Sequence, residues 1–337
     1  MKAIFLCDGD PIVGDQIFNV FLPSVRNKIA ELVDIEDRSY KSGDVIRNPE
    51  KFSAVEYIFS TWGIPKFTEE EIGKYFPALK CIFYGAGSVH SFGRSYLSRG
   101  VKIFSSWAAN GIPVAEFTVA QIILANKGYF LLNRLFHDEG KSASEKLTDT
   151  FIGNYGETVG IIGAGMIGSL VIKMLKQYNL NVLVYDPYLS EERVRELGVT
   201  RCSLETLFEK SLTVSNHLPD KESTRNIINY SLFSRMRDKA VFINTGRGAQ
   251  VVEEDLVRIL RERPNMTALL DVTYPKEPVK DHPFYTLRNC LLTPHMAGSH
   301  GGEVARMGEY MLDEFKAFLD GKPTKYEVTL KMLETMA

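Results

Sequence analysis

The sequence predicts an α/β protein of two domains, in which a doubly wound parallel-sheet domain is inserted into a smaller α/β domain. The chain has 337 residues, more than one ordinary hydrophobic core of ~100–200 residues requires. Short apolar runs alternate with helix-like stretches on both sides of a long apolar segment at 112–136. The last helical pattern, at 301–323, is expected to return to the first domain. We therefore predict domain boundaries of 1–109 with 300–337, and 110–299.

In the first domain, a short apolar run of strand length recurs four times. One helix-like stretch, "TEEEIGKYF" at 68–76, separates two of these runs. The long segment at 112–136 then reads as a helix too apolar to have one face in water, and we expect it to be buried between domains or subunits. The predicted strands are "KAIFL" at 2–6, "AVEYIFS" at 54–60, "LKCIFYG" at 79–85 and "VKIF" at 101–104.

In the second domain, the alternation of strands and helices is stronger. Runs of buried β-branched residues separated by helical or turn segments are typical of a parallel sheet covered on both faces. After them, Val304, Met307, Met311 and Phe315 follow a helical spacing that Gly321 and Pro323 end. The predicted strands are "TVGIIG" at 158–163, "NVLVYD" at 181–186, "LTVSNHL" at 212–218, "KAVFINTG" at 239–246, "TALLDVT" at 267–273 and "NCLLTPH" at 289–295.

Composition argues against several classes of protein. A formal net charge of -2, from 40 basic and 42 acidic residues, leaves no electrostatic bias towards nucleic acid. We see no signal-peptide pattern and no run near the ~18 apolar residues of a membrane helix, so we expect no contact with a bilayer. The four cysteines, Cys7, Cys81, Cys202 and Cys290, lack metal-like spacing, and we interpret them as buried, reduced thiols of a cytoplasmic protein.

The strongest chemical motif is a glycine fingerprint, "TVGIIGAGMIG", with Gly163, Gly165 and Gly168 in G-x-G-x-x-G spacing. A strand precedes it, a helix follows, and a second strand ends in Asp186, close to the ~20 residues expected before a ribose-binding acid. This context indicates a Rossmann domain that binds a pyrophosphate at a helix N-terminus. An acidic group at Asp186 disfavours a 2′-phosphate, so NAD is expected rather than NADP.

Two further motifs follow strand ends in the second domain. Arg247 lies in a Gly-Arg-Gly turn, where its fork suits a carboxylate. His295 ends the run "CLLTPH", and a histidine that acts as an acid or base needs an orienting partner, which a carboxylate on the loop at 274–281 can supply. Read alone, Arg247 is more often a surface ion-pairing residue, His295 a satisfied core residue and Glu277 a solvated loop residue.

Taken together and in this order, the segments resemble the D-isomer-specific 2-hydroxyacid dehydrogenase family. The resemblance covers about 61–323. It includes the glycine fingerprint and "GAGS" at 85–88, "AANGIPVAE" at 108–116, "HLPDKESTRNII" at 217–228, "INTGRG" at 243–248 and "TPHMAGS" at 293–299. It implies a flavodoxin-like substrate domain, a homodimer with 114–132 as its interface, and interconversion of a 2-hydroxy acid and its 2-oxo acid.

The resemblance also assigns roles to residues. Arg247 would bind the substrate carboxylate together with the N–H groups of Gly85, Ala86, Gly87 and Ser88, His295 would donate the proton, and Glu277 would pair with His295 and raise its pKa. Asp271 would hold the nicotinamide carboxamide. The remaining expected cofactor contacts are Gly163, Gly165, Met166, Ile167, Gly168, Asp186, His217, Leu218, Pro219, Thr224, Thr245, Gly246 and Gly298.

One loop departs from the family pattern. The family commonly reads D-V-T-x-P-E-P, whereas this chain has "DVTYPKEP" at 271–278, so an ungapped match places Lys276 where the glutamate belongs. We favour Glu277, since its Glu-Pro pair is retained, but a lysine facing His295 would instead disfavour the protonated imidazole. Another departure is Met166, at a position often occupied by arginine in the family. The alternatives to an enzyme are a regulatory, co-repressor-like dimer that senses NAD(H), and hydrolysis or transfer with tightly held NAD.

Overall fold

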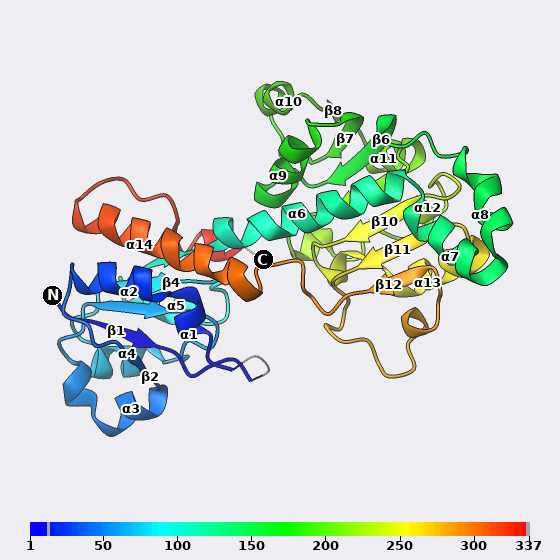
Figure 1. The fold of residues 1–337 in the computed structure, drawn as a ribbon. Coiled ribbons are helices and arrows are strands. Elements are labelled where there is room, and N and C mark those ends of the chain that lie inside the picture. Colours follow the sequence, from blue (N-terminus) through cyan, green and yellow to red (C-terminus); the bar gives the residue numbers. More distant parts are fainter. Residues whose placement is uncertain (12–13, 335–337) are drawn as a thin grey trace. The chain divides into compact units, whose positions relative to one another are not determined.

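The chain divides into two compact units in the computed structural model, which describes residues 1–11 and 14–334. Unit 1 comprises Met1–Asn110 and Ser299–Ala337, and unit 2 comprises Gly111–Gly298. Each boundary lies one residue from the one we predicted. In Figure 1 the blue, cyan and red ends of the chain make up unit 1, and the green and yellow middle makes up unit 2. Unit 2 is thus inserted into unit 1.

Unit 1 is a six-stranded sheet in the order β13-β5-β4-β3-β1-β2. Strands β1 to β5 are parallel and β13 is antiparallel to β5, so the parallel part has the strand order 2-1-3-4-5 of flavodoxin-like folds. The strands are β1 (Ala3–Leu6), β2 (Ser39–Tyr40), β3 (Tyr57–Ser60), β4 (Cys81–Tyr84), β5 (Lys102–Ser105) and β13 (Glu327–Val328). The helices are α1 (Ile17–Val20), α2 (Pro23–Ala30), α3 (Ser42–Arg47), α4 (Glu69–Tyr75), α5 (Gly93–Ser98) and α14 (Ala305–Leu319).

An aromatic row holds one face of this sheet. Phe5, Phe59, Phe83 and Phe104 are cross-strand partners in four adjacent strands, and all are fully buried. The Phe59–Phe83 and Phe83–Phe104 ring centroids are 5.2 Å and 5.0 Å apart, and Phe315 of α14 meets Phe59 and Phe83 edge-on. Such pairs add stabilisation beyond their buried area. The C-terminal helix therefore completes the core of unit 1, which confirms its predicted return.

Unit 2 is a seven-stranded parallel sheet in the order β12-β11-β10-β9-β6-β7-β8, which in its own numbering is the 3-2-1-4-5-6 order of a Rossmann fold with one strand added. Its strands are β6 (Tyr155–Ile162), β7 (Asn179–Tyr185), β8 (Thr200–Arg201), β9 (Thr213–Asn216), β10 (Val241–Asn244), β11 (Thr267–Leu270) and β12 (Cys290–Leu292). Its helices are α7 (Tyr129–Glu139), α8 (Lys141–Thr148), α9 (Met166–Leu175), α10 (Glu191–Leu197), α11 (Leu204–Lys210), α12 (Tyr230–Phe233) and α13 (Glu253–Glu262).

Two separate apolar clusters cover the two faces of the unit 2 sheet. One joins α9 to the strands through Val171, Ile172 and Leu175, together with Ile122 of the long helix α6 (Trp107–Asn126). The other joins α11, α12 and α13 to the opposite face through residues such as Phe208, Phe233 and Phe242. A sheet buried on both faces explains why its strands are continuous apolar runs rather than alternating ones.

The helix α6 corrects two expectations. The apolar segment at 112–136 is two helices, because Gly128 adopts a left-handed φ of 73° and ends the first of them. By length and composition, α6 is also apolar enough to cross a membrane, although we predicted no such run. Within unit 2, however, Thr118, Ile122 and Ala125 of this helix are fully buried against the sheet. Its hydrophobicity is that of a core helix.

Candidate active site

The glycine loop lies between the end of β6 and the start of α9. Gly163 has a φ of 86°, a conformation that favours glycine. A Cβ at Gly168 would lie 2.0 Å from the carbonyl oxygen of Gly163, so helix and loop approach as closely as backbone allows. A Cβ at Gly165, in contrast, would meet no atom within 4 Å. The fold thus requires Gly163 and Gly168, whereas Gly165 leaves an open face on the loop, where its backbone is not covered by other atoms.

The N-terminus of α9 lies next to this open face. Gly165 is the N-cap residue and supplies no side chain to the first N–H groups of the helix. Uncapped N–H groups at a helix start attract anions, phosphate in particular. Met166 opens the helix, and its Cε would be 2.5 Å from a Cβ at Gly111, so this side chain packs on α6. Ile167, the next residue, is half-buried.

Asp186 follows β7 and reaches back to the glycine loop. Its Oδ2 accepts a hydrogen bond from the N–H of Ala164 at 2.9 Å, and its Oδ1 accepts one from the N–H of Tyr188 at 2.9 Å. The carboxylate is therefore held at the mouth of the glycine loop, which is the place where a Rossmann domain presents an acid to a ribose.

The segment after β9 carries four of the predicted contacts, His217, Leu218, Pro219 and Thr224. The backbone N–H of His217 donates to the Ile162 carbonyl at 2.8 Å, so the segment lies against the end of β6. Burial lowers the pKa of His217 to about 4, which keeps its imidazole neutral. The hydroxyl of Thr224 donates to the carbonyl oxygen of Pro219 at 2.7 Å and closes the turn.

A buried amide network, which sequence reasoning did not find, positions the arginine turn. Nδ2 of Asn216 donates to Oδ1 of Asn244 at 3.0 Å and to Oε1 of Gln250 at 3.1 Å. In turn, Oε1 of Gln250 accepts the N–H of Arg247, and Nδ2 of Asn244 donates to the Arg247 carbonyl. Buried amides such as these are costly unless fully paired, so a satisfied network fixes the turn. The signal in the sequence was a polar residue at the end of two successive apolar strands.

Thr245 and Gly246, both predicted cofactor contacts, lie inside this turn. The Thr245 hydroxyl shares a hydrogen bond of 2.9 Å with the Thr118 hydroxyl of α6, and both side chains are buried. A Cβ at Gly246 would come within 3.0 Å of the Asn216 amide, so the turn and β9 are in contact. Both residues therefore also serve to seat the turn that carries Arg247.

Arg247 itself is partly buried at the carboxyl end of β10. Burial lowers the pKa of its guanidinium, and the nearby Asp220 acts in the opposite direction. Its Nη1 donates to the Gly246 carbonyl at 2.8 Å. Among the residues that the structure describes, no carboxylate lies within 4 Å to form an ion pair with this guanidinium. A desolvated cation without a counter-ion is suited to bind an anion.

Asp271, at the end of β11, organises the turn that carries His295. Its Oδ1 accepts hydrogen bonds from the Thr293 hydroxyl at 2.6 Å and the Met296 N–H at 2.8 Å, and its Oδ2 accepts the Ala297 N–H at 3.0 Å. These bonds fold the chain around His295, which has an unusual φ of 59°. The predicted Asp271 therefore acts on the histidine turn, and Gly298 closes unit 2 two residues beyond that turn's Met296.

The predicted rise in the pKa of His295 requires correction. The pKa of His295 is lowered, chiefly by burial, while Asp271 raises it and Arg247 and Lys276 lower it further. Glu277, exposed on the same loop, is not among the groups that act on it. Our expectation that the pKa of His295 is raised is therefore wrong. The pairing of Glu277 with the imidazole stays a prediction.

Contacts with its surroundings fix the conformation of the loop that carries Lys276. The Tyr274 N–H donates to Oε1 of the largely buried Glu253 at 2.8 Å, and the Thr273 hydroxyl donates to the Lys276 carbonyl at 3.1 Å. A Cβ at Gly248 would lie 2.1 Å from the Thr273 backbone, so the loop rests directly on the arginine turn. Glu253, which the sequence did not single out, therefore supports the loop from α13.

In unit 1, the predicted substrate loop Gly85–Ser88 follows β4. The N–H of Gly85 donates to the Ser60 carbonyl at 2.7 Å, and the Ser105 hydroxyl donates to the Ala86 carbonyl at 3.0 Å. Within the described residues, the N–H groups of Gly87 and Ser88 have no acceptor. The loop is rigid at its base and keeps donors for a ligand.

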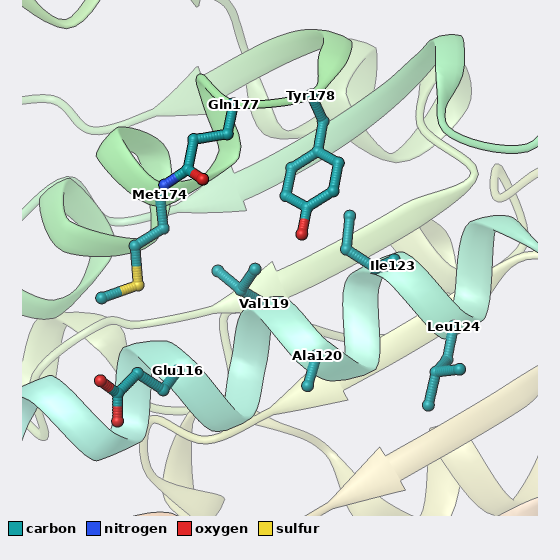
Figure 2. Close-up of a pocket in the computed structure, with 8 residues that line it drawn as sticks. All are labelled: Glu116, Val119, Ala120, Ile123, Leu124, Met174, Gln177 and Tyr178. Atoms are coloured by element: carbon teal, nitrogen blue, oxygen red, sulfur yellow. The ribbon is translucent and has the colours of Figure 1, made fainter.

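A shallow apolar groove of about 680 Å³ lies elsewhere on unit 2, between α6 and the end of α9. Figure 2 shows Val119, Ile123 and Leu124 of α6 on one side and Met174 and Tyr178 on the other. None of the residues predicted for catalysis lines it. It is therefore a surface feature separate from the strand-end site.

The chain is similar to known proteins of one family. Residues 119–297 match the family model described as D-isomer specific 2-hydroxyacid dehydrogenase, NAD binding domain. D-3-phosphoglycerate dehydrogenase of Archaeoglobus fulgidus is 30% identical over 70% of this chain and 44% of its own length. Glyoxylate reductase of Korarchaeum cryptofilum is 37% identical over 50% of this chain and 51% of its own.

The matched part thus spans about half the length of these curated relatives. A phosphoglycerate oxidoreductase from Rhizobium etli has the same fold at 20% identity, with a TM-score of 0.78 over 98% of this chain and 99% of its own. The match to the family model covers more than half of the sequence, including the glycine loop, Arg247 and His295. The chain belongs to the D-isomer-specific 2-hydroxyacid dehydrogenase family.

Proposed function

We propose that the protein uses NAD(H) to interconvert a D-2-hydroxy acid and its 2-oxo acid, with His295 as the proton carrier. One observation carries the proposal: Arg247, Asp271 and His295 follow β10, β11 and β12, three neighbouring strands whose carboxyl ends share one edge of the sheet. Open α/β sheets bind ligands at this edge. An anion-binding cation next to a titratable imidazole suits a substrate with a carboxylate beside a carbonyl.

The glycine loop fits a dinucleotide. The open face at Gly165 and the uncapped start of α9 accept a pyrophosphate, while Asp186 lies where the adenosine ribose is expected. The carboxylate of Asp186 would repel a 2′-phosphate, which supports a preference for NAD over NADP. When bound, the nicotinamide supplies or accepts the hydride at C2 of the substrate.

The residues of the chain perform the remaining steps. Arg247 binds the substrate carboxylate and stabilises the negative charge that develops on the C2 oxygen during reduction. His295 donates its proton to that oxygen in reduction and removes it from the hydroxyl in oxidation. Asp271 holds the turn that aims His295. The free N–H groups of Gly87 and Ser88 in unit 1 are a further proposed anion-binding element.

The lowered pKa of His295 sets a pH dependence. Reduction needs the imidazolium, which is lost as the pH rises through a pKa below the ordinary value of about 6.5. Oxidation needs the neutral imidazole, which is present above that pKa. As the pH rises, we expect the rate of reduction to fall before neutral pH is reached, whereas the rate of oxidation should be retained at neutral pH. Rates measured in both directions from pH 5 to 8 would show this.

We further propose a cytoplasmic homodimer. Four free cysteines, three of them buried, suit a reducing compartment. The groove between α6 and α9 offers apolar surface, since Leu124 and Tyr178 are each 41% exposed, and its α6 side lies within the segment 114–132 expected at the interface. A second copy of the chain would bury this surface. Leu124→Glu should then shift the protein to the monomer on size-exclusion chromatography.

The central experiment is oxidation of NADH and of NADPH by the purified protein with a panel of 2-oxo acids. We expect turnover with NADH, and a loss of about 10² to 10⁴ in turnover for His295→Ala with NADH affinity retained. His90→Ala, at an exposed histidine of unit 1, is the matched control. Undiminished turnover of the His295 variant would remove it from the mechanism. NADH binding without turnover of any acid would favour a regulatory dinucleotide sensor.

A further inference from the structure

In unit 1, the hydroxyl of Ser105 contacts the loop 85–88 from a neighbouring strand. Ser105 is the last residue of β5, which pairs with β4, and its side chain is fully buried. Its hydroxyl donates to the Ala86 carbonyl at 3.0 Å and also to the Gly87 carbonyl, so its one proton is shared between two acceptors. A single buried side chain thus determines where two consecutive carbonyl groups of the loop point.

The direction of each carbonyl also determines the direction of the N–H group that follows it. All peptide bonds of this loop are trans, and in a planar trans peptide the C=O and the N–H point in opposite directions. Because the hydroxyl holds two consecutive carbonyls, the N–H groups of Gly87 and Ser88 must point away from Ser105. These are the N–H groups that have no acceptor within the described residues. Ser105 therefore turns two free donors towards the opposite side of the loop.

The start of the loop is held separately, by residues that follow β3. The Gly85 N–H donates to the Ser60 carbonyl at 2.7 Å, and the fully buried Thr61 donates from its hydroxyl to the Gly85 carbonyl at 2.8 Å. Of the side chains that the structure describes, Ser105 is the one that bonds to the next two carbonyls of the loop. The conformation of these two peptides thus depends on its hydroxyl.

The direction of the two peptides decides which charge the loop presents. Successive N–H groups that point the same way form a concave site for an anion, because their partial positive charges add. If the same peptides were turned over, they would present two carbonyl oxygens, which repel a carboxylate. The Ser105 hydroxyl favours the first arrangement, because the second would leave both it and the site without suitable partners.

We propose that Ser105 is a positioning residue, whose hydroxyl aims the N–H groups of Gly87 and Ser88 at the substrate carboxylate. This inference rests on the proposed function, in which these N–H groups bind that anion. Ser105 acts through the loop and does not touch the substrate itself. Its loss should therefore weaken binding of the acid and raise KM, while the transfer of hydride and proton, and with it kcat, is nearly unchanged.

The test is Ser105→Ala, which removes the hydroxyl without adding volume. We expect KM for the best 2-oxo acid of the panel to rise about 10-fold and kcat to change by less than about 2-fold. Ser105→Cys keeps a weaker donor and should give an intermediate KM, so the test does not depend on the alanine variant alone. Binding of oxamate, an unreactive 2-oxo acid analogue, to the protein with NADH present gives a second readout by nicotinamide fluorescence. Affinity for NADH alone should be unchanged, because its glycine loop lies in unit 2.

Ser60→Ala is the matched control. Ser60 is also fully buried at the end of its strand, β3, and its hydroxyl donates to the Leu6 carbonyl of β1 rather than to the loop. Both alanine variants lose a buried hydrogen bond and should lower Tm by similar amounts, but Ser60→Ala should retain KM and oxamate affinity.

Two results would overturn this inference while the proposed function stands. One is an unchanged KM in either Ser105 variant, and the other is an equal rise in KM for Ser105→Ala and Ser60→Ala, which would show a purely structural role. If the unaltered protein reduces no 2-oxo acid and binds no oxamate, the inference and the proposed function are both overturned.

Discussion

The tripeptide Gly-Ala-Gly follows a buried parallel strand in both units, at 85–87 after β4 and at 163–165 after β6. In unit 2 it leads directly into α9, and a third glycine, Gly168, lies against Gly163. In unit 1 the residue at the same spacing is His90, and the next helix, α5, begins only at Gly93. The difference teaches that a dinucleotide site depends on the helix start and the third glycine rather than on the tripeptide.

The two tripeptides also use their first glycine differently. Gly163 needs its positive φ to turn the chain beneath His217. Gly85 does not have a positive φ. A glycine is needed there because a Cβ would lie 2.6 Å from the Val20 side chain and 3.2 Å from the Phe21 side chain. The same residue type thus serves backbone conformation in unit 2 and side-chain packing in unit 1.

The largest effect is expected where Gly168 contacts Gly163 in unit 2. Gly168→Ala would place a methyl group 2.0 Å from the Gly163 oxygen, and rigid backbone cannot move aside cheaply. We expect a loss of about 3 kcal/mol in the free energy of unfolding and at least a 100-fold loss of NADH affinity, measured by denaturant unfolding and fluorescence titration. His90→Gly, which completes the same glycine spacing in unit 1, should create no additional NADH site. Normal NADH affinity of the Gly168 variant would contradict this account.

A second variant separates fold from ligand. Gly165→Ala meets no atom within 4 Å, so its free energy of unfolding should change by less than about 1 kcal/mol. A pyrophosphate that approaches this backbone would nevertheless meet the new methyl group, and we expect NADH to bind about 10-fold to 100-fold more weakly. Gly87→Ala in unit 1 is the matched control and should bind NADH normally. An unchanged NADH affinity for Gly165→Ala would place the pyrophosphate elsewhere.

The histidines of the two units predict a pH effect on stability. His217 has its pKa lowered by burial to about 4, so between pH 6.5 and 4 the unfolded chain binds a proton that the folded chain does not. The stability that this histidine contributes is present above pH 6.5 and falls as the pH falls. We expect a loss of about 2 kcal/mol between pH 7 and 5, which thermal unfolding would follow. His217→Gln should reduce this dependence, whereas the exposed His90→Gln should retain it.

The smallest effect belongs to unit 1. Gly85→Ala crowds the flexible side chains of Val20 and Phe21, which can shift, so we expect a loss of about 1 kcal/mol in the free energy of unfolding. NADH affinity should be unchanged, because this loop is not the dinucleotide cradle. A weaker NADH affinity in this variant would show that the two loops are coupled.

The length of a strand decided whether it could be predicted from the local sequence. All ten predicted strands are present, because short apolar runs carry a local signal. Strands β2, β8 and β13 have two residues each and were not predicted, since so short a segment is defined by its hydrogen-bonded neighbour rather than by its own composition. Gly128 could have been read as a helix end, as its left-handed conformation now shows.

The sequence by itself determined the strand pattern, the insertion of one domain into the other and the glycine fingerprint, and it indicated Arg247 and His295 as candidate site residues. These rest on local periodicity and on residue types that few other roles require. Only the tertiary structure decided that Asn216, Asn244 and Gln250 hold the arginine turn in place, and that Asp271 folds the histidine turn. Those contacts join residues far apart in the chain. The position of the loop after β11 likewise depends on contacts with Gly248 and Glu253, which no local sequence pattern predicts.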